Sequence, residues 1–211
     1  MADNILPEFL TIVVAHALAV ASPGPDFALV LRQSLAHGRR TALWSSLGIG
    51  CGLSVHITYC ILGLGFLLKS SAPALAAIQY LGAAYLFYVG LQALRARPRS
   101  GDLELAPGPA APTVGAAWLN GFLVNVLNPK AALFFISLFP LAVSVTTPKL
   151  VQAGYGVWMT LSTIAWFSFV SVVFTQEKVR RRFLRHGHWI DRGLGVVFIG
   201  FAVSLVLAKL N

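Results

Sequence analysis

The chain has 211 residues, of which 57% are hydrophobic and only 11% are charged, and its mean hydropathy is +0.75. A soluble domain is nearer half apolar and about one quarter charged. The composition therefore excludes an ordinary soluble domain and predicts an integral membrane protein.

Six apolar segments are long enough to cross a bilayer as helices, for which about 20 residues are needed. Barrel strands would alternate with a period of two, and these segments do not, so an all-α membrane protein is expected. The first segment has no Lys or Arg before it and is too long for a cleaved signal peptide. The six predicted spans cover residues 5–34, 41–68, 73–94, 114–145, 149–174 and 190–208.

The first predicted span contains the sequence Ser22-Pro23-Gly24-Pro25-Asp26. Proline lacks an amide donor and disrupts the preceding turn, but it suits the first position of a new helix. We therefore predict a broken helix in which Pro25 begins the second half, capped by Gly24 or Ser22. Irregular backbone inside a membrane is tolerated only where protein or an aqueous cavity surrounds it.

The second predicted span contains residues that can titrate or react. His56 could relay a proton, because histidine titrates near neutral pH, and we include it among the candidate site residues ahead of His16. The alternative is a neutral histidine bonded to a neighbouring helix. Cys51 and Cys60 raise the alternative of a membrane thiol oxidoreductase, although they lie about 13 Å apart along one helix and cannot bridge each other.

Residues 95–112 are the one long segment of low hydrophobicity, and their Pro, Gly and charged residues are typical of a flexible linker. This segment divides a single membrane domain into two halves of three predicted spans each. The predicted boundaries are 1–99 for the first half, 100–112 for a cytoplasmic linker and 113–211 for the second half.

The two halves resemble each other in sequence. GPDFALV at 24–30 aligns with NPKAALF at 128–134, and at the same offset GCG at 50–52 aligns with GYG at 154–156. Since each half has an odd number of spans, the two repeats must be inverted across the membrane. Inverted repeats with broken helices between them are a transporter architecture.

The fourth predicted span is expected to break like the first, with Asn128 as the cap and Pro129 as the first residue of a half-helix. Both breaks then expose amide donors and the positive end of a helix dipole, which attract a carboxylate. Lys130 stands in the first turn, where the dipole disfavours a cation. An ionised Asp or Lys near mid-membrane costs roughly 2.5–3.5 kcal/mol, so some other interaction must stabilise Lys130.

Asp26 and Lys130 occupy equivalent positions in the two repeats and carry opposite charges. One interpretation is a structural ion pair between the half-bundles. The other is a site for a zwitterion, with Asp26 for an α-ammonium group and Lys130 with the exposed amides for an α-carboxylate. Asp26 lies only about 9 Å from Arg32 at the end of a straight helix, so the two charges could also lie at different depths.

Positive charges concentrate on one side of the predicted bundle, with twelve near the loops after the first, third and fifth spans against three opposite. Lys and Arg mark the cytoplasmic side, so both termini are expected to be non-cytoplasmic. The net charge of +9 then indicates orientation and attraction to anionic lipids rather than nucleic-acid binding. The twelve are Arg32, Arg39, Arg40, Arg95, Arg97, Arg99, Lys178, Arg180, Arg181, Arg182, Arg185 and Arg192, and the three are Lys69, Lys149 and Lys209.

The sequence resembles the lysine exporter/threonine–homoserine exporter (LysE/RhtB) family. SPGPD in the first span and NGFLVNVLNPKAALFF in the fourth carry the resemblance, and LGIGCGLSVH and LGAAYLFYVGLQALRA support it over nearly the whole chain. The resemblance implies an exporter of amino acids or related metabolites in the inner membrane, driven by the proton gradient. It also implies a functional core of Pro23, Gly24, Pro25, Asp26, Asn128, Pro129 and Lys130, with Asn125 as a neighbour.

Together these features predict a secondary transporter that exports amino acids or similar zwitterions by proton antiport. Asp26 is the candidate for the coupling proton, and Lys130 for the substrate charge. We expect no enzymatic activity, because no hydrolase or nucleotide-binding motif is present, and no cofactor or resident metal. A metal-ion exporter is an alternative, although its Cys, His and Met ligands would be scattered. Exposed helix faces are compatible with a homodimer, and the particular substrate is not predicted.

Overall fold

The computed structural model describes residues 5–70, 72–97, 111–144 and 146–207, and every regular element within these ranges is a helix. Most of the predicted linker lies outside them. The described helices are α1 (Ile5–Ala21), α2 (Pro25–His37), α3 (Arg39–Ser70), α4 (Ala72–Leu94), α5 (Val114–Val126), α6 (Pro129–Ala142), α7 (Lys149–Val173) and α8 (Glu177–Leu207).

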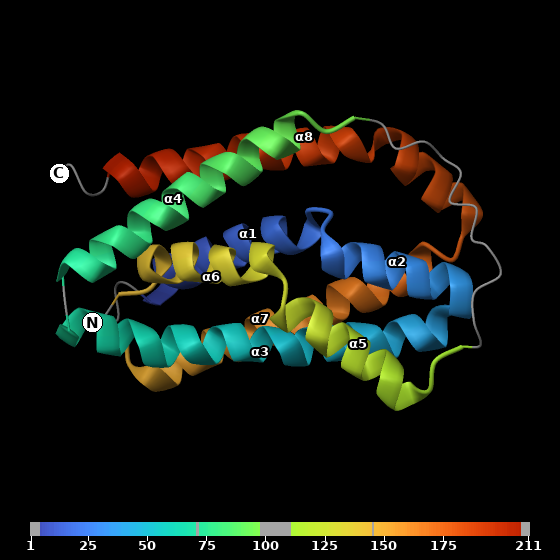
Figure 1. Cartoon of the computed structure of the whole chain (residues 1–211), viewed down its shortest axis with the longest axis horizontal. Helices are drawn as coiled ribbons and strands as arrows, with labels where there is room; N and C mark the ends of the chain where they lie inside the picture. The colour runs from blue at the N-terminus through green and yellow to red at the C-terminus, as the bar shows by residue number, and fades with distance from the viewer. Residues whose placement is uncertain (1–4, 71, 98–110, 145, 208–211) are drawn as a thin grey trace.

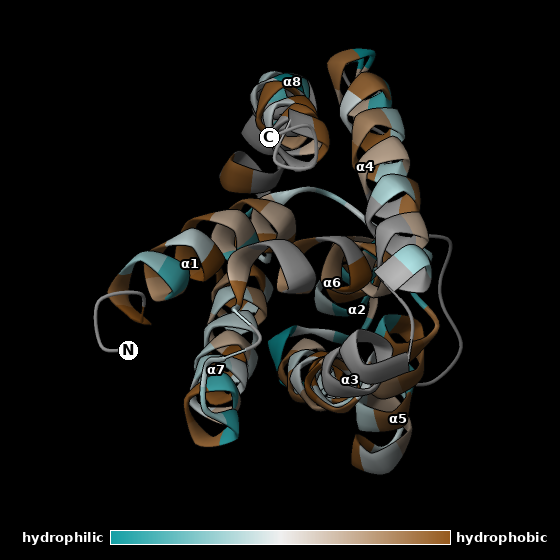
Figure 2. Cartoon of the chain, turned by 90° about the vertical axis from the view of Figure 1, so that its left-hand side faces the viewer, coloured by the Kyte–Doolittle hydropathy of each residue, from teal (hydrophilic) through white to brown (hydrophobic). Residues whose placement is uncertain are grey.

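The helices are arranged in three layers (Figure 1). The pair α4 and α8 forms one outer layer, α1, α2 and α6 lie in the middle, and α3, α5 and α7 form the opposite layer (Figure 2). Helices from different halves of the sequence therefore pack directly on one another. α4 contacts α8 along its length, and α3 contacts both α5 and α7.

Both predicted helix breaks are confirmed. The axis turns by 51° between α1 and α2 and by 49° between α5 and α6. Pro25 begins α2 and Pro129 begins α6. Asn128 caps α6 as expected, because its Oδ1 accepts a hydrogen bond of 3.0 Å from the Lys130 backbone N–H. Gly24 is the cap residue of α2, with extended backbone and no side-chain hydrogen bond.

Four of the six predicted spans satisfy the length and hydropathy expected of a membrane helix. Among the described residues these are 39–63 of α3, the whole of α7, and two broken spans. One broken span is α1 with α2, and the other is α5 with the first part of α6. The other two predicted spans fall within α4 and α8. The helix α8 begins at Glu177, well before the predicted start at residue 190, because its basic first part consists largely of good helix formers.

The outer surface of the described helices is rich in large apolar side chains. Leu62 is 68% exposed, Val196 62% and Leu161 61%. Extended apolar surface of this kind is rare on soluble monomers. Polar residues such as His16 and Asn125 are instead buried in the interior. This distribution suits a protein surrounded by lipid.

Glycines bring α3 and α5 into backbone contact. A Cβ atom added at Gly121 of α5 would lie 2.0 Å from the Ser45 carbonyl oxygen, and one added at Gly48 of α3 would lie 2.0 Å from that of Trp118. The Ser45 hydroxyl also donates a hydrogen bond of 3.0 Å to the Ala117 carbonyl. Small residues permit such close crossings in membrane helices. The crossing fixes the position of Asn125, one turn beyond Gly121.

We expect Gly121→Ala to lower the unfolding midpoint in detergent, because the methyl group would push α3 and α5 apart. Forcing extra atoms into a packed interface typically costs about 1–3 kcal/mol. The matched control is Gly115→Ala in the same helix, where an added Cβ meets nothing within 4 Å. Equal midpoints for the two variants would contradict a close crossing.

Candidate functional site

The Asp26 carboxylate lies where the two helix breaks meet. Asp26 belongs to the first turn of α2, and its Oδ2 accepts hydrogen bonds from two side chains of the other break: Asn125 Nδ2 at 3.0 Å and Asn128 Nδ2 at 3.1 Å. Both asparagines are buried, with 1% and 4% of their surface exposed. Side chains at the second break thus donate the hydrogen bonds that hold the Asp26 carboxylate of the first break.

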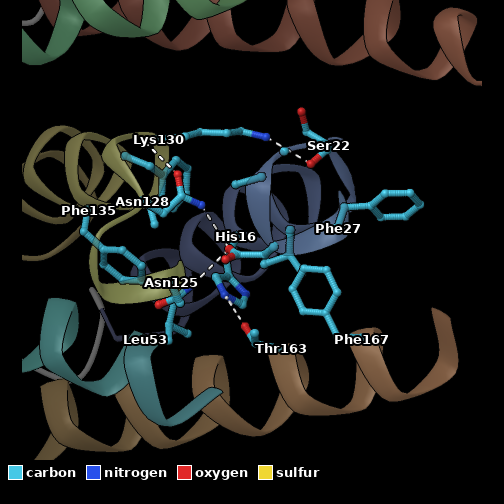
Figure 3. Close-up of a pocket in the computed structure, with 16 residues that line it drawn as sticks. His16, Ser22, Phe27, Leu53, Asn125, Asn128, Lys130, Phe135, Thr163 and Phe167 are labelled. Carbon is cyan, nitrogen blue, oxygen red and sulfur yellow. Dashed lines mark hydrogen bonds between the residues drawn. The ribbon is translucent and has the colours of Figure 1, made fainter. Parts of the chain in front are cut away.

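Lys130 makes the reciprocal contact. Its Nζ donates to the backbone carbonyl oxygens of Ser22 at 3.0 Å and Pro23 at 3.4 Å, immediately after α1 ends (Figure 3). Carbonyl groups at a helix C-terminus lack partners within the helix and carry a partial negative charge, so they stabilise a cation. This contact explains why a lysine is tolerated in the first turn of α6.

Asp26 and Lys130 therefore interact electrostatically without hydrogen-bonding to each other. The sequence left open a direct ion pair or two separate charges, and the structure favours separate charges. Lys130 crosses the first break next to Gly24, where an added Cβ atom would lie in van der Waals contact with Lys130, at 3.4 Å from its Cδ and 3.5 Å from its Nζ.

A small cavity of about 50 Å³ lies beside Asp26 (Figure 3). Its polar lining includes His16, Thr163, Asn125 and Asn128, and aromatic side chains such as Phe135 form apolar walls. A single water molecule needs roughly 10–15 Å³ of such volume, so only a few waters would fit. In this conformation the cavity is too small for an amino acid.

Two buried oxygen atoms at this cavity have no hydrogen-bond partner among the described residues: Asp26 Oδ1 and Asn125 Oδ1. Buried polar atoms are nearly always paired, so an orphaned pair calls for an explanation. Both atoms are acceptors. A water molecule, a proton on Asp26 or an ammonium group would therefore satisfy them.

The sequence analysis ranked His56 ahead of His16 as a candidate, whereas in the structure His16 lines the cavity and His56 does not. His56 lies one layer behind the cavity, where Nε2 bonds to the Asn125 carbonyl at 3.0 Å, Nδ1 to the Tyr59 hydroxyl at 2.9 Å, and the ring stacks on Phe135. His16 lines the cavity itself and bonds to the Thr163 hydroxyl at 3.1 Å. Neither its type nor its spacing distinguishes His16 from His56 in the sequence.

Glu8 forms a second buried polar cluster that the sequence analysis did not identify as a site. Its carboxylate accepts hydrogen bonds from the Thr147 hydroxyl at 2.9 Å, from the Ser144 backbone N–H at 3.0 Å and from the Tyr155 hydroxyl at 3.4 Å. These contacts tie the start of α1 to the α6–α7 connection and to α7. The only sequence signal was an acid near the start of an apolar segment.

The alternative functions would require clustered metal ligands or thiols that face each other. Among the described residues, no three or more His, Cys, Asp or Glu side chains are placed to hold a metal ion together. Cys51 is half-buried, Cys60 is buried, and both thiols are free. No observation in the described part of the chain therefore favours metal export or thiol chemistry.

Opposite charges held at two helix breaks, inside a bundle with an apolar exterior, are typical of membrane transport proteins. The chain belongs to the LysE type translocator family, whose pattern matches residues 17–209.

Relatives of the chain align with it over nearly its full length. A threonine efflux protein of Salmonella typhi is 34% identical over 206 residues, which cover 97% of this chain and 100% of the relative. The threonine efflux protein of Escherichia coli K12 is 33% identical, with the same coverage, and an uncharacterized membrane protein of Pseudomonas aeruginosa is 32% identical over 98% of each chain. No solved structure matches the chain.

We expect Asn128→Ala to lower the unfolding midpoint, because the change removes both the α6 cap and a donor to buried Asp26. Loss of an N-cap alone costs about 0.5–2 kcal/mol. The matched control is Asn120→Ala on an exposed position of α5. Thermal unfolding in detergent provides the measurement, and an equal effect of the two changes would show that the cap and the Asp26 contact contribute nothing.

Proposed function

We propose that this protein exports small neutral amino acids or similar zwitterions across the cytoplasmic membrane by proton antiport. The observation that carries the proposal is the reciprocal arrangement of Asp26 and Lys130 at the two helix breaks. A half-buried acid with one buried oxygen unpartnered and a half-buried cation complement an ammonium and a carboxylate group. The relatives named as threonine efflux proteins make threonine the first substrate to test.

Asp26 is proposed to bind either a proton or the substrate ammonium, so that the two compete for one carboxylate. Competition of this kind couples export of the amino acid to entry of a proton. Asn125 and Asn128 keep the carboxylate oriented toward the cavity through their amide hydrogen bonds. His16 and Thr163 form the opposite wall, and His56 positions Asn125 from behind.

Lys130 is proposed to bind the substrate carboxylate. Its present partners, the carbonyl oxygens of Ser22 and Pro23, are single backbone acceptors that a carboxylate can replace with a stronger charge-assisted bond. The exposed amides at the start of α6 favour an anion at the same place. Pro25 and Pro129 maintain the breaks that make these groups accessible.

The proposed mechanism is alternating access in a six-span protein built from two inverted repeats, α1–α4 and α5–α8. The similar bends of 51° and 49° and the matching Pro motifs support the repeats. The excess of positive charge after the first, third and fifth predicted spans supports non-cytoplasmic termini and contact with anionic lipids. Exposed apolar faces such as that around Leu161 would permit a homodimer.

Counterflow in proteoliposomes tests the function. Purified protein would be loaded with unlabelled amino acids and offered the labelled counterparts, beginning with threonine. We expect exchange that Asp26→Asn and Lys130→Ala each reduce about tenfold or more, since a charged hydrogen bond contributes about 1.5–3 kcal/mol. Lys149→Ala, an exposed lysine at the start of α7, is the matched control.

Folding of each variant would be checked by its unfolding midpoint. If Asp26→Asn and Lys130→Ala insert normally and exchange at the full rate, the proposed roles are wrong. If the unaltered protein is folded but exchanges none of the amino acids, the proposed substrate class is wrong.

A further inference from the structure

A second, larger cavity lies on the other side of Lys130, between the helix breaks and the α4–α8 pair. Its volume is about 480 Å³, compared with about 50 Å³ for the cavity at Asp26. Small-molecule sites in proteins usually measure about 300–1,000 Å³. Of the two cavities around the breaks, only the second is thus large enough for an amino acid in this conformation.

The second cavity contains both signs of charge. Lys130 lines both cavities, together with Ser22 and Gly24 of the first break. Asp191 of α8 lines the second cavity, is only 6% exposed and interacts electrostatically with Lys130. A half-buried cation and a buried acid that line one cavity complement the carboxylate and the ammonium of a zwitterion.

Close packing between α4 and α8 sets the position of Asp191. A Cβ atom added at Gly195 would lie 2.7 Å from the Gly90 carbonyl oxygen, so the two backbones touch there. Asp191 precedes Gly195 by one helical turn and therefore lies on the same face of α8. A hydrogen bond of 3.2 Å from Arg192 Nε to the carbonyl of Ala96, just after α4, holds α8 in the same position relative to α4.

The remaining wall of the second cavity has groups suited to a small polar side chain. Tyr88 and Gln92 of α4 line it and hydrogen-bond to each other, and Tyr85 lies one turn before them. The lining continues along α4 and beyond its end to Ala96, next to Arg95 and close to the side that positive charges predict to be cytoplasmic. Substrate would thus enter this cavity from the cytoplasm.

We propose that this cavity is a second substrate site, the first that a zwitterionic amino acid reaches, in which Lys130 holds the carboxylate and Asp191 the α-ammonium group. The proposal rests on the export function proposed above. The substrate would then move into the cavity beside Asp26. Its ammonium group would leave Asp191 and bind Asp26. Its carboxylate would remain on Lys130 throughout, and no covalent bond would form or break.

Asp191→Asn tests the second site, with labelled threonine as the probe in everted and right-side-out membrane vesicles. We expect the change to raise the half-saturating concentration of threonine about tenfold or more on the cytoplasmic face, where substrate enters, and to leave the value on the opposite face unchanged. Preference for threonine over 3-hydroxybutyrate, which lacks the ammonium group, should fall on the same face. Asp191→Glu, which keeps the charge, should restore much of both properties.

A normal half-saturating concentration and a normal preference in folded Asp191→Asn would overturn the second site. Should that variant not fold, Ala93→Phe decides instead, since Ala93 lines the cavity and a benzyl group would fill it. A raised half-saturating concentration on the same face supports the site, and an unchanged value overturns it. Failure of the export function is distinguishable, because the unaltered protein would then exchange no threonine at all.

Discussion

The structure depends on one constraint: two helices are interrupted inside an apolar bundle, where the charges and backbone groups at the interruptions need partners from the protein or from a polar cavity. The protein meets this constraint because each break supplies hydrogen-bonding partners for the charged side chain of the other. Amides from the second break hold Asp26 of the first, and carbonyl groups from the first hold Lys130 of the second. Neither break could be stabilised in this way if the other were absent.

The positions of the breaks could be predicted from the sequence, because proline acts locally: it lacks an amide donor, and its ring fixes one backbone angle. The Asn128 cap was predictable for the same reason. The partners of Asp26 and Lys130 were not, because Asn125 and Ser22 come from segments about a hundred residues away in the sequence. The identity of the cavity-lining histidine depends equally on packing, which the similar apolar surroundings of His16 and His56 do not reveal.

Lys130 lines both cavities at the breaks, and these cavities differ in size. The space beside Asp26 holds only a few waters, whereas the space beside Asp191 is large enough for a small ligand. At the other end of α1, Glu8 ties the helix to the α6–α7 connection. In the proposed transport cycle, this arrangement would correspond to a state that receives substrate on the α4–α8 side.

The close approaches of Gly48 to Trp118 and of Gly121 to Ser45 join a helix of the first sequence half to a helix of the second. In the proposed transport cycle, a hinge between the two halves would have to pull these backbone contacts apart. A boundary between moving bodies that cuts through each half would leave them intact, whereas one that follows the linker would not. By the same logic, the two halves made as separate polypeptides would each expose an uncovered glycine face, and each would require the other in order to fold.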